Sequence, residues 1–245
     1  MRIFSFCCLL ALFFLGGCHE REERKMLRIG IDASWAPLDF DAMQPYVYGY
    51  TEDFLMEIAH YSGLEFEKIN ANQDTLLSGM SNHVYDAVLS YLPPYEFNQA
   101  RYDFSDNYLT TGPVLVASKT SSSLSLQKLS NQVVGIISGS DSVLVLEANP
   151  DVIIRSYESI PDLLNAVVLE EITACVLDRL HALKYVRDLY SKSLKVVSDP
   201  LNQQGLHLVV LKGTHPNLLR AFNQGIERMM KKKQLAQLQQ KWNLE

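Results

Sequence analysis

The sequence is poor in cysteine and has no excess of basic residues. Four cysteines in 245 residues are too few for a disulfide scaffold. Lys and Arg number 22 against 28 Asp and Glu, which gives a formal net charge of −6, whereas a nucleic-acid-binding protein needs a basic surface. The six histidines are scattered, with no pair at metal-ligand spacing. We therefore expect no disulfide framework, no nucleic-acid partner, no metal and no cofactor.

An apolar run stands at the N-terminus. Residues 3–15 are almost wholly apolar and follow Arg2, but a membrane-spanning helix needs about 20 residues. A basic start, a short apolar run and small residues are typical of an export signal. The sequence Leu-Gly-Gly-Cys at 15–18 resembles the lipobox of bacterial lipoproteins, whose cysteine is lipidated and becomes the first residue. This predicts a signal peptide over 1–17 and lipid on Cys18, with a plain secretory signal as the alternative.

Two features follow from a cleavage before Cys18. The mixed charges of residues 18–25 indicate a solvated tether between lipid and domain. Cys175 would be the one thiol left without lipid, and its apolar neighbours Ala174, Val176 and Leu177 indicate a buried strand. We expect no disulfide.

Strand-like and helix-like stretches alternate from Met26 onward, which favours parallel βαβ units and an α/β fold. The alternation repeats after a Ser-rich polar link at 120–125, so two units are expected. The sequence Ser-Ile-Pro-Asp at 159–162 has the form of a capping box that opens a helix. Apolar periodicity over 217–242 predicts one long amphipathic helix at the C-terminus.

Short motifs occur in a characteristic order from Leu27 to the C-terminus. They are Ile-Asp-Ala-Ser-Trp-Ala-Pro-Leu-Asp-Phe at 31–40, Gly-Tyr at 49–50 with Asp53, Tyr-Asp-Ala-Val at 85–88, Asp-Phe-Ser-Asp-Asn-Tyr at 103–108, Val-Leu-Asp at 176–178 and Lys-Trp at 241–242. In this order and spacing they resemble the polar amino acid binding proteins of bacterial ABC importers, solute-binding protein family 3.

The resemblance implies a two-lobed periplasmic-binding-protein type II fold with a two-strand hinge. Lobe one would comprise 26–115 plus 206–245, and lobe two 116–205. Two crossings of the chain suit a clamp that closes over a ligand, and ligands of α/β sheets lie at the carboxyl ends of strands.

The resemblance also assigns roles at the cleft between the lobes. Trp35 would cover the ligand side chain, with packing under its own turn as the alternative. Asp178 would receive the α-amino group, and a cap for the helix starting at Arg179 is a compatible alternative. The full set of expected ligand-binding residues is Asp32, Trp35, Ser90, Leu92, Asn98, Ser140, Asp141 and Asp178.

Two positions depart from the family pattern. The family holds the ligand carboxylate with an arginine where this chain has Asn98, and Arg101 lies three residues later. The family also has a threonine on that carboxylate where this chain has Asp141. A carboxylate about 4 Å from another is repelled by roughly 4 kcal/mol at an effective dielectric of 20. The alternative for Asp141 is a cap in the first turn of a helix.

Together, the composition, the N-terminal signal and the family resemblance predict a non-enzymatic solute-binding protein. It would capture a polar amino acid or a related small solute of cationic character, such as a basic amino acid, a polyamine or a modified derivative. It would deliver this small polar solute to an ABC permease in the inner membrane, as a monomer anchored by lipid in the periplasm or at the cell surface. The alternatives are a dehydratase-like member of the same fold and a surface lipoprotein with a degenerate cleft.

Overall fold

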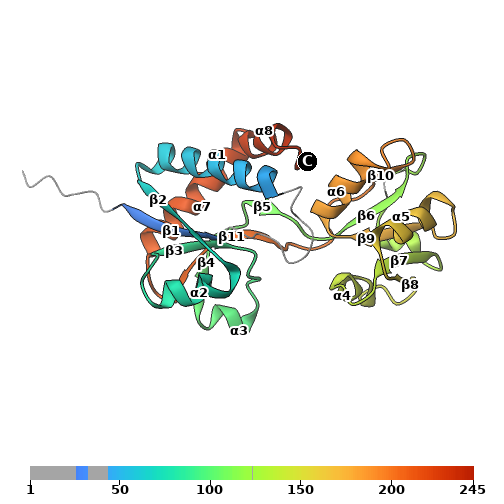
Figure 1. Cartoon of the computed structure of the whole chain (residues 1–245), viewed down its shortest axis with the longest axis horizontal. Coiled ribbons are helices and arrows are strands. Elements are labelled where there is room, and N and C mark those ends of the chain that lie inside the picture. Colours follow the sequence, from blue (N-terminus) through green and yellow to red (C-terminus); the bar gives the residue numbers. More distant parts are fainter. Residues whose placement is uncertain (1–25, 33–43, 123) are drawn as a thin grey trace, which may run out of the picture.

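The computed structural model describes residues 26–32, 44–122 and 124–245. These residues form two α/β bodies, each built on one mixed sheet, which lie end to end along the long axis of the molecule (Figure 1). Within the described residues, no helix combines the length and the apolar character needed to cross a bilayer. The expected signal, Cys18, the tether and Trp35 lie outside the described part of the chain.

The first body is built on a sheet in the order β2-β1-β3-β11-β4, with β5 paired to β11. β1 runs parallel to β2 and β3, while β11 runs antiparallel to β3, β4 and β5. A strand from late in the chain therefore lies between two early ones. The strands are β1 (Leu27–Asp32), β2 (Phe66–Ala71), β3 (Ala87–Ser90), β4 (Tyr102–Phe104), β5 (Leu109–Thr110) and β11 (Gly205–Leu211).

Helices cover both faces of this sheet. They are α1 (Gln44–Ser62), α2 (Gln73–Ser81), α3 (Glu96–Gln99), α7 (Pro216–Lys231) and α8 (Gln234–Lys241). α1 and α7 meet through Phe54 and Phe222, whose ring centroids are 5.5 Å apart, and Phe54 stacks on Tyr108 at 4.3 Å. On the other face, Met80 of α2 packs in a cluster with Val209. Both clusters are buried, so each face contributes hydrophobic stabilisation.

The second body is built on a sheet in the order β10-β6-β9-β7-β8. Its strands are β6 (Val114–Ser118), β7 (Val133–Ile137), β8 (Ile153–Tyr157), β9 (Ala174–Leu177) and β10 (Leu194–Val196), and its helices are η2 (Leu126–Leu129), α4 (Ser142–Glu147), α5 (Ile160–Val168) and α6 (Arg179–Asp188). Cys175 is fully buried in β9, as its neighbours indicate. Burial raises the pKa of its thiol, which keeps it protonated and unreactive.

Helix α5 begins as the sequence predicts. The Ser159 hydroxyl accepts from the backbone N–H of Asp162 at 3.2 Å and donates to its carboxylate at 2.6 Å. Pro161 stands in the first turn, where a missing N–H costs nothing.

The prediction of one long C-terminal helix is wrong. The segment divides into α7 and α8, which are separated at Lys232 and Lys233. Lys233 has a left-handed backbone with φ 59°, and such a residue ends an α-helix and redirects the chain. The break turns α8 back onto α1, where the Trp242 indole donates to Asp53 at 2.7 Å.

The chain crosses between the bodies twice. It leaves the first body between Thr110 and Val114 and returns between Val196 and Gly205. The lobe boundary expected at residue 115 lies inside β6, because Val114 already pairs with β9. The boundary expected at 206 lies one residue inside β11.

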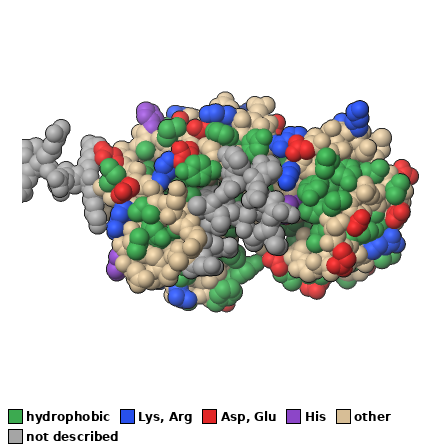
Figure 2. Space-filling view, in the orientation of Figure 1, with side chains coloured by type: hydrophobic (Ala, Val, Ile, Leu, Met, Phe, Trp, Pro, Cys, Tyr) green, Lys and Arg blue, Asp and Glu red, His purple; other side chains and the backbone are tan. Residues whose placement is uncertain are grey.

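Helix α6 of the second body also contacts the first body. Leu180 is buried in the main apolar cluster of the first body with Tyr50 and Tyr108. The Arg179 guanidinium donates to the Thr110 carbonyl at 3.0 Å, and Arg187 lies over the Tyr46 ring. The two bodies are therefore held together by side chains as well as by the crossings. Charged side chains of both signs are scattered over the face of both bodies that Figure 2 shows.

Candidate functional site

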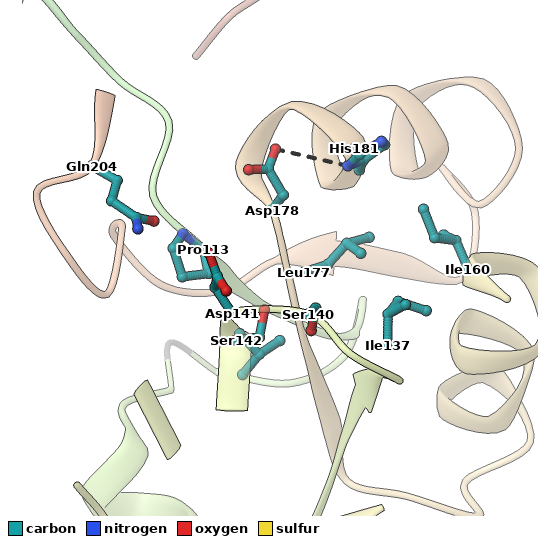
Figure 3. Close-up of a pocket in the computed structure, with 11 residues that line it drawn as sticks. Pro113, Ile137, Ser140, Asp141, Ser142, Ile160, Leu177, Asp178, His181 and Gln204 are labelled. Atoms are coloured by element: carbon teal, nitrogen blue, oxygen red, sulfur yellow. Dashed lines mark ion pairs between the residues drawn. The ribbon is translucent and has the colours of Figure 1, made fainter. Parts of the chain in front are cut away.

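A cavity of about 360 Å³ lies at one end of the strands of the second sheet, beside the two segments that cross between the bodies. β7 and β9 run parallel, and their carboxyl ends open into it, which is where α/β sheets bind ligands. The turn after β7 and the start of α6 supply its polar groups, while the crossings supply the wall toward the first body (Figure 3). The lining residues are Pro113, Ile137, Ser140, Asp141, Ser142, Ile160, Val176, Leu177, Asp178, His181 and Gln204.

Asp178 follows β9 directly and occupies the N-cap position of α6. Its carboxylate accepts from the backbone N–H of Leu180 at 3.0 Å and lies 3.9 Å from Nδ1 of His181. Burial against the cavity wall raises the pKa of Asp178 above its ordinary value, while His181 and the helix N–H groups oppose the rise. The side chain is still 45% exposed. Asp178 therefore caps the helix, as one interpretation of the sequence predicts, and it also presents a carboxylate to the cavity; its role toward an α-amino group stays a prediction.

The turn between β7 and α4 brings Ser140 and Asp141 to the same cavity. Gly139 makes this turn with φ 72°, a backbone that favours glycine. Asp141 takes the N-cap position of α4, but its side chain makes no capping hydrogen bond. The capping interpretation of Asp141 is therefore wrong, and its exposed carboxylate lines the cavity instead. The Ser140 hydroxyl oxygen is buried and has no hydrogen-bond partner in the described structure.

The expected residues of the first body do not line this cavity. Ser90 ends β3, and its hydroxyl accepts from the Leu92 N–H at 3.1 Å. The Leu92 side chain packs against the cluster under α2. Asn98 is 8% exposed, and its amide donates to the Pro93 carbonyl at 2.8 Å. Asn98 thus holds its own turn together.

Two other candidates need separate statements. Asp32 is the last residue of β1, and its side chain is outside the described structure. Arg101 is exposed, with its guanidinium carbon 5.5 Å from the centre of the Tyr102 ring, and it is absent from the described lining of the cavity. It therefore supplies no cation to the cavity in this arrangement of the bodies.

Sequence reasoning missed His181 and Gln204. His181 stands three residues after Asp178, so both lie on one face of α6, and this spacing was readable from the sequence. Gln204 lies in the second crossing, outside any strand or helix, where no local pattern marks it. Figure 3 places Gln204 on the far side of Pro113 from His181.

The titratable side chains that line the cavity are those of Asp141, Asp178 and His181. Among the described lining residues there is no Lys or Arg. The cavity therefore favours a positively charged group. In the part of the chain that the structure describes, no three His, Cys, Asp or Glu residues come together as metal ligands.

A second hollow of about 450 Å³ adjoins the cavity, and we call it the α4 groove. Asp141 and Gln204 line both spaces. The groove runs along α4 and reaches Tyr95 of the first body, so it spans the gap between the bodies. Its lining residues are Tyr95, Leu126, Gln127, Asp141, Leu144, Val145, Ala148, Asn149, Leu201, Asn202 and Gln204.

Comparisons with known proteins match nearly the whole described chain. The family model for bacterial extracellular solute-binding proteins, family 3, matches residues 27–245. The L-cystine-binding protein TcyJ of Escherichia coli is 25% identical over 230 residues, covering 93% of this chain and 86% of that protein. The arginine-binding extracellular protein ArtP of Bacillus subtilis is 23% identical over 241 residues, covering 96% of this chain and 94% of that protein.

Solved structures show the same fold. The L-cystine solute receptor of Neisseria gonorrhoeae, in an unliganded open conformation, matches with a TM-score of 0.71 at 20% identity, covering 90% of this chain and 93% of the receptor. The second substrate-binding domain of GlnP from Lactococcus lactis matches with a TM-score of 0.68 at 17% identity, covering 90% of this chain and 96% of the domain. The two mixed sheets are thus those of a type II periplasmic-binding-protein fold, as expected.

Proposed function

Since this chain belongs to family 3 of the bacterial extracellular solute-binding proteins, we propose that it captures a positively charged amino acid and passes it to an ABC permease in the inner membrane. It is the substrate-binding component of an amino-acid ABC transporter and carries out no catalysis. The choice of a cationic solute goes beyond the family, and it rests on the charges that line the cavity.

One observation carries the proposal. Asp141 and Asp178 line the same cavity, and there is no Lys or Arg among its described lining residues. Burial raises the pKa of Asp178, and a partly desolvated carboxylate of this kind is stabilised by a cationic partner. The relative named for arginine suits this cavity, because arginine carries a net positive charge.

We further propose that the bodies act as the two lobes of a clamp. The cavity wall consists of the second body and the crossings, so a bound solute would be exposed until the first body moves over it. Ser90, Leu92, Asn98, Asp32 and Trp35 are the residues that the closing lobe would bring toward the solute. A solute that contacts both lobes favours the closed state by its additional contacts there.

Titration calorimetry tests the solute class. We expect L-arginine and L-lysine to bind, L-glutamine to bind at least tenfold more weakly, and spermidine to report whether an ammonium alone suffices. Asp178→Asn should weaken the basic amino acids at least tenfold, because hydrogen bonds to charged groups contribute about 1.5–3 kcal/mol. Tighter binding of glutamine than of all three cations would overturn the proposal.

The place of the protein in the cell forms a second part of the proposal. Relatives are extracellular or periplasmic solute-binding proteins. The lipobox-like sequence supports lipidation at Cys18, after which residues 18–25 would tether the monomeric domain to the membrane surface.

A further inference from the structure

We propose that the cavity binds a short peptide with a basic first residue more tightly than the free amino acid, with the ammonium group of the peptide at Asp178 and its second residue in the α4 groove. This rests on the proposed function, because it keeps the cationic group and the same cavity. It adds that the carboxylate of the first residue is blocked by a peptide bond. It also adds that the more tightly bound solute is longer than one amino acid.

The first argument concerns charge. A free amino acid carries its carboxylate a few ångströms from its ammonium group. When the ammonium group lies at Asp178, the carboxylate of the same molecule therefore lies in the same cavity. The described lining offers it Asp141 and no Lys or Arg. A peptide bond replaces that carboxylate with a neutral carbonyl, which removes the like-charge repulsion.

The second argument concerns a hydrogen-bond donor. The Ser140 hydroxyl oxygen is buried, lines the cavity and has no partner in the described structure. A hydroxyl left without a partner in a buried position is unfavourable. A peptide carbonyl accepts a hydrogen bond from such a hydroxyl, as a carboxylate does, and the like charge of Asp141 is what favours the neutral carbonyl.

The third argument concerns space. The cavity continues into the α4 groove past Asp141 and Gln204, which line both. The groove is lined by apolar side chains on both bodies, and two of them stay well exposed: Leu144 at 58% and Tyr95 at 47%. A second residue of the solute would cover this apolar surface, and it would touch both bodies at once.

Three ligands separate these arguments in titration calorimetry of the purified full-length protein. L-arginine has a free carboxylate, L-argininamide has a neutral amide in its place, and L-arginyl-L-alanine adds a second residue. We expect argininamide to bind at least tenfold more tightly than arginine. We expect the dipeptide to bind at least tenfold more tightly than argininamide.

A substitution in the groove tests the position of the second residue. Ala148 lines the groove at the end of α4, whereas its exposed neighbour Glu147 is absent from the described lining. Ala148→Trp should weaken the dipeptide at least tenfold and leave argininamide within twofold. Glu147→Trp is the matched control and should leave both ligands within twofold.

The outcomes distinguish this inference from the proposed function. If arginine binds at least as tightly as both derivatives, the peptide inference is overturned and the cationic amino acid stands. If Ala148→Trp weakens argininamide and the dipeptide equally, the groove does not hold the second residue. If none of the three ligands binds, the proposed function fails as well.

Discussion

The guanidinium carbon of Arg187 lies 5.2 Å from the centre of the Tyr46 ring, and this contact joins α6 of the second body to α1 of the first. In the clamp proposed above, this arrangement is the open state, because the first body's expected binding residues do not line the cavity. The contact would then favour the open state over the closed one.

Removing that contact should make closing easier. An exposed cation–π contact contributes about 0.5–1 kcal/mol, so Arg187→Ala should tighten solute binding roughly two- to fivefold by calorimetry. Lys184→Ala is the control, because Lys184 lies on the same helix over the ring of its neighbour Tyr185 and joins no second body. Weaker binding in Arg187→Ala alone would mean that the contact belongs to the closed state.

The stability of the fold should fall in mild acid because of His207. Burial lowers the pKa of His207 below its ordinary value of 6.5, while the Ser105 carbonyl and Asp106 oppose the shift. The unfolded chain then takes up the proton first, so the free energy of unfolding decreases as the pH falls through about 6.5. Urea denaturation between pH 7.5 and 5.5 measures this decrease.

His207→Gln should flatten that pH dependence, because the substituted side chain does not titrate. His60→Gln is the control, since His60 is exposed on α1, and it should keep the slope of the unmodified protein. An unchanged slope in His207→Gln would contradict the assignment.

Gly49 should tolerate no side chain. A Cβ atom at this position would lie 2.2 Å from the Trp242 ring, which is held in place by its hydrogen bond to Asp53. Overpacking costs about 1–3 kcal/mol, against a gain of about 1 kcal/mol from the better helix former. Gly49→Ala should thus lower the free energy of unfolding by up to about 2 kcal/mol.

A double-mutant cycle checks the cause of that loss. In a Trp242→Leu background the ring is gone, so Gly49→Ala should become neutral or stabilising by denaturant titration. The same penalty in both backgrounds would show that the ring is not responsible.

Cys18 should carry the lipid. In cells, Cys18→Ser should move the protein from the membrane fraction to the soluble fraction. Mass spectrometry of the N-terminal peptide should find an acylated cysteine as the first residue of the unmodified protein. An unmodified N-terminus elsewhere near residue 18 would instead support a plain secretory signal.

The expected residues of the second body line the described cavity, and those described in the first body do not. Asp178 directly follows β9, and Ser140 and Asp141 follow β7 by three and four residues. Strand ends are both readable from the hydrophobic pattern and fixed in space by the sheet. Asn98 is expected at the site only because of the family resemblance, and its amide donates to the Pro93 carbonyl within its own turn. Position in a motif did not determine where that side chain points.

The features that the sequence did not predict depend on backbone conformations or chain paths that no local pattern marks. The break in the C-terminal helix depends on the left-handed backbone of Lys233, a conformation that lysine seldom adopts and that no pattern marks. Gln204 lines both hollows from an irregular crossing, and only the path of the chain between the bodies brings it there. The approach of Arg187 to Tyr46 joins residues far apart in the chain, so no local pattern indicates it.

The insertion of β11 between β3 and β4 has a consequence for the order of synthesis. The second body is continuous from Val114 to Val196 and has all its strands by then. The first body, although its residues emerge earlier, lacks a central strand until Leu211 has been made. The early strands of the first body therefore lack their central neighbour for most of translation. An incomplete sheet suits a chain that must stay unfolded for export.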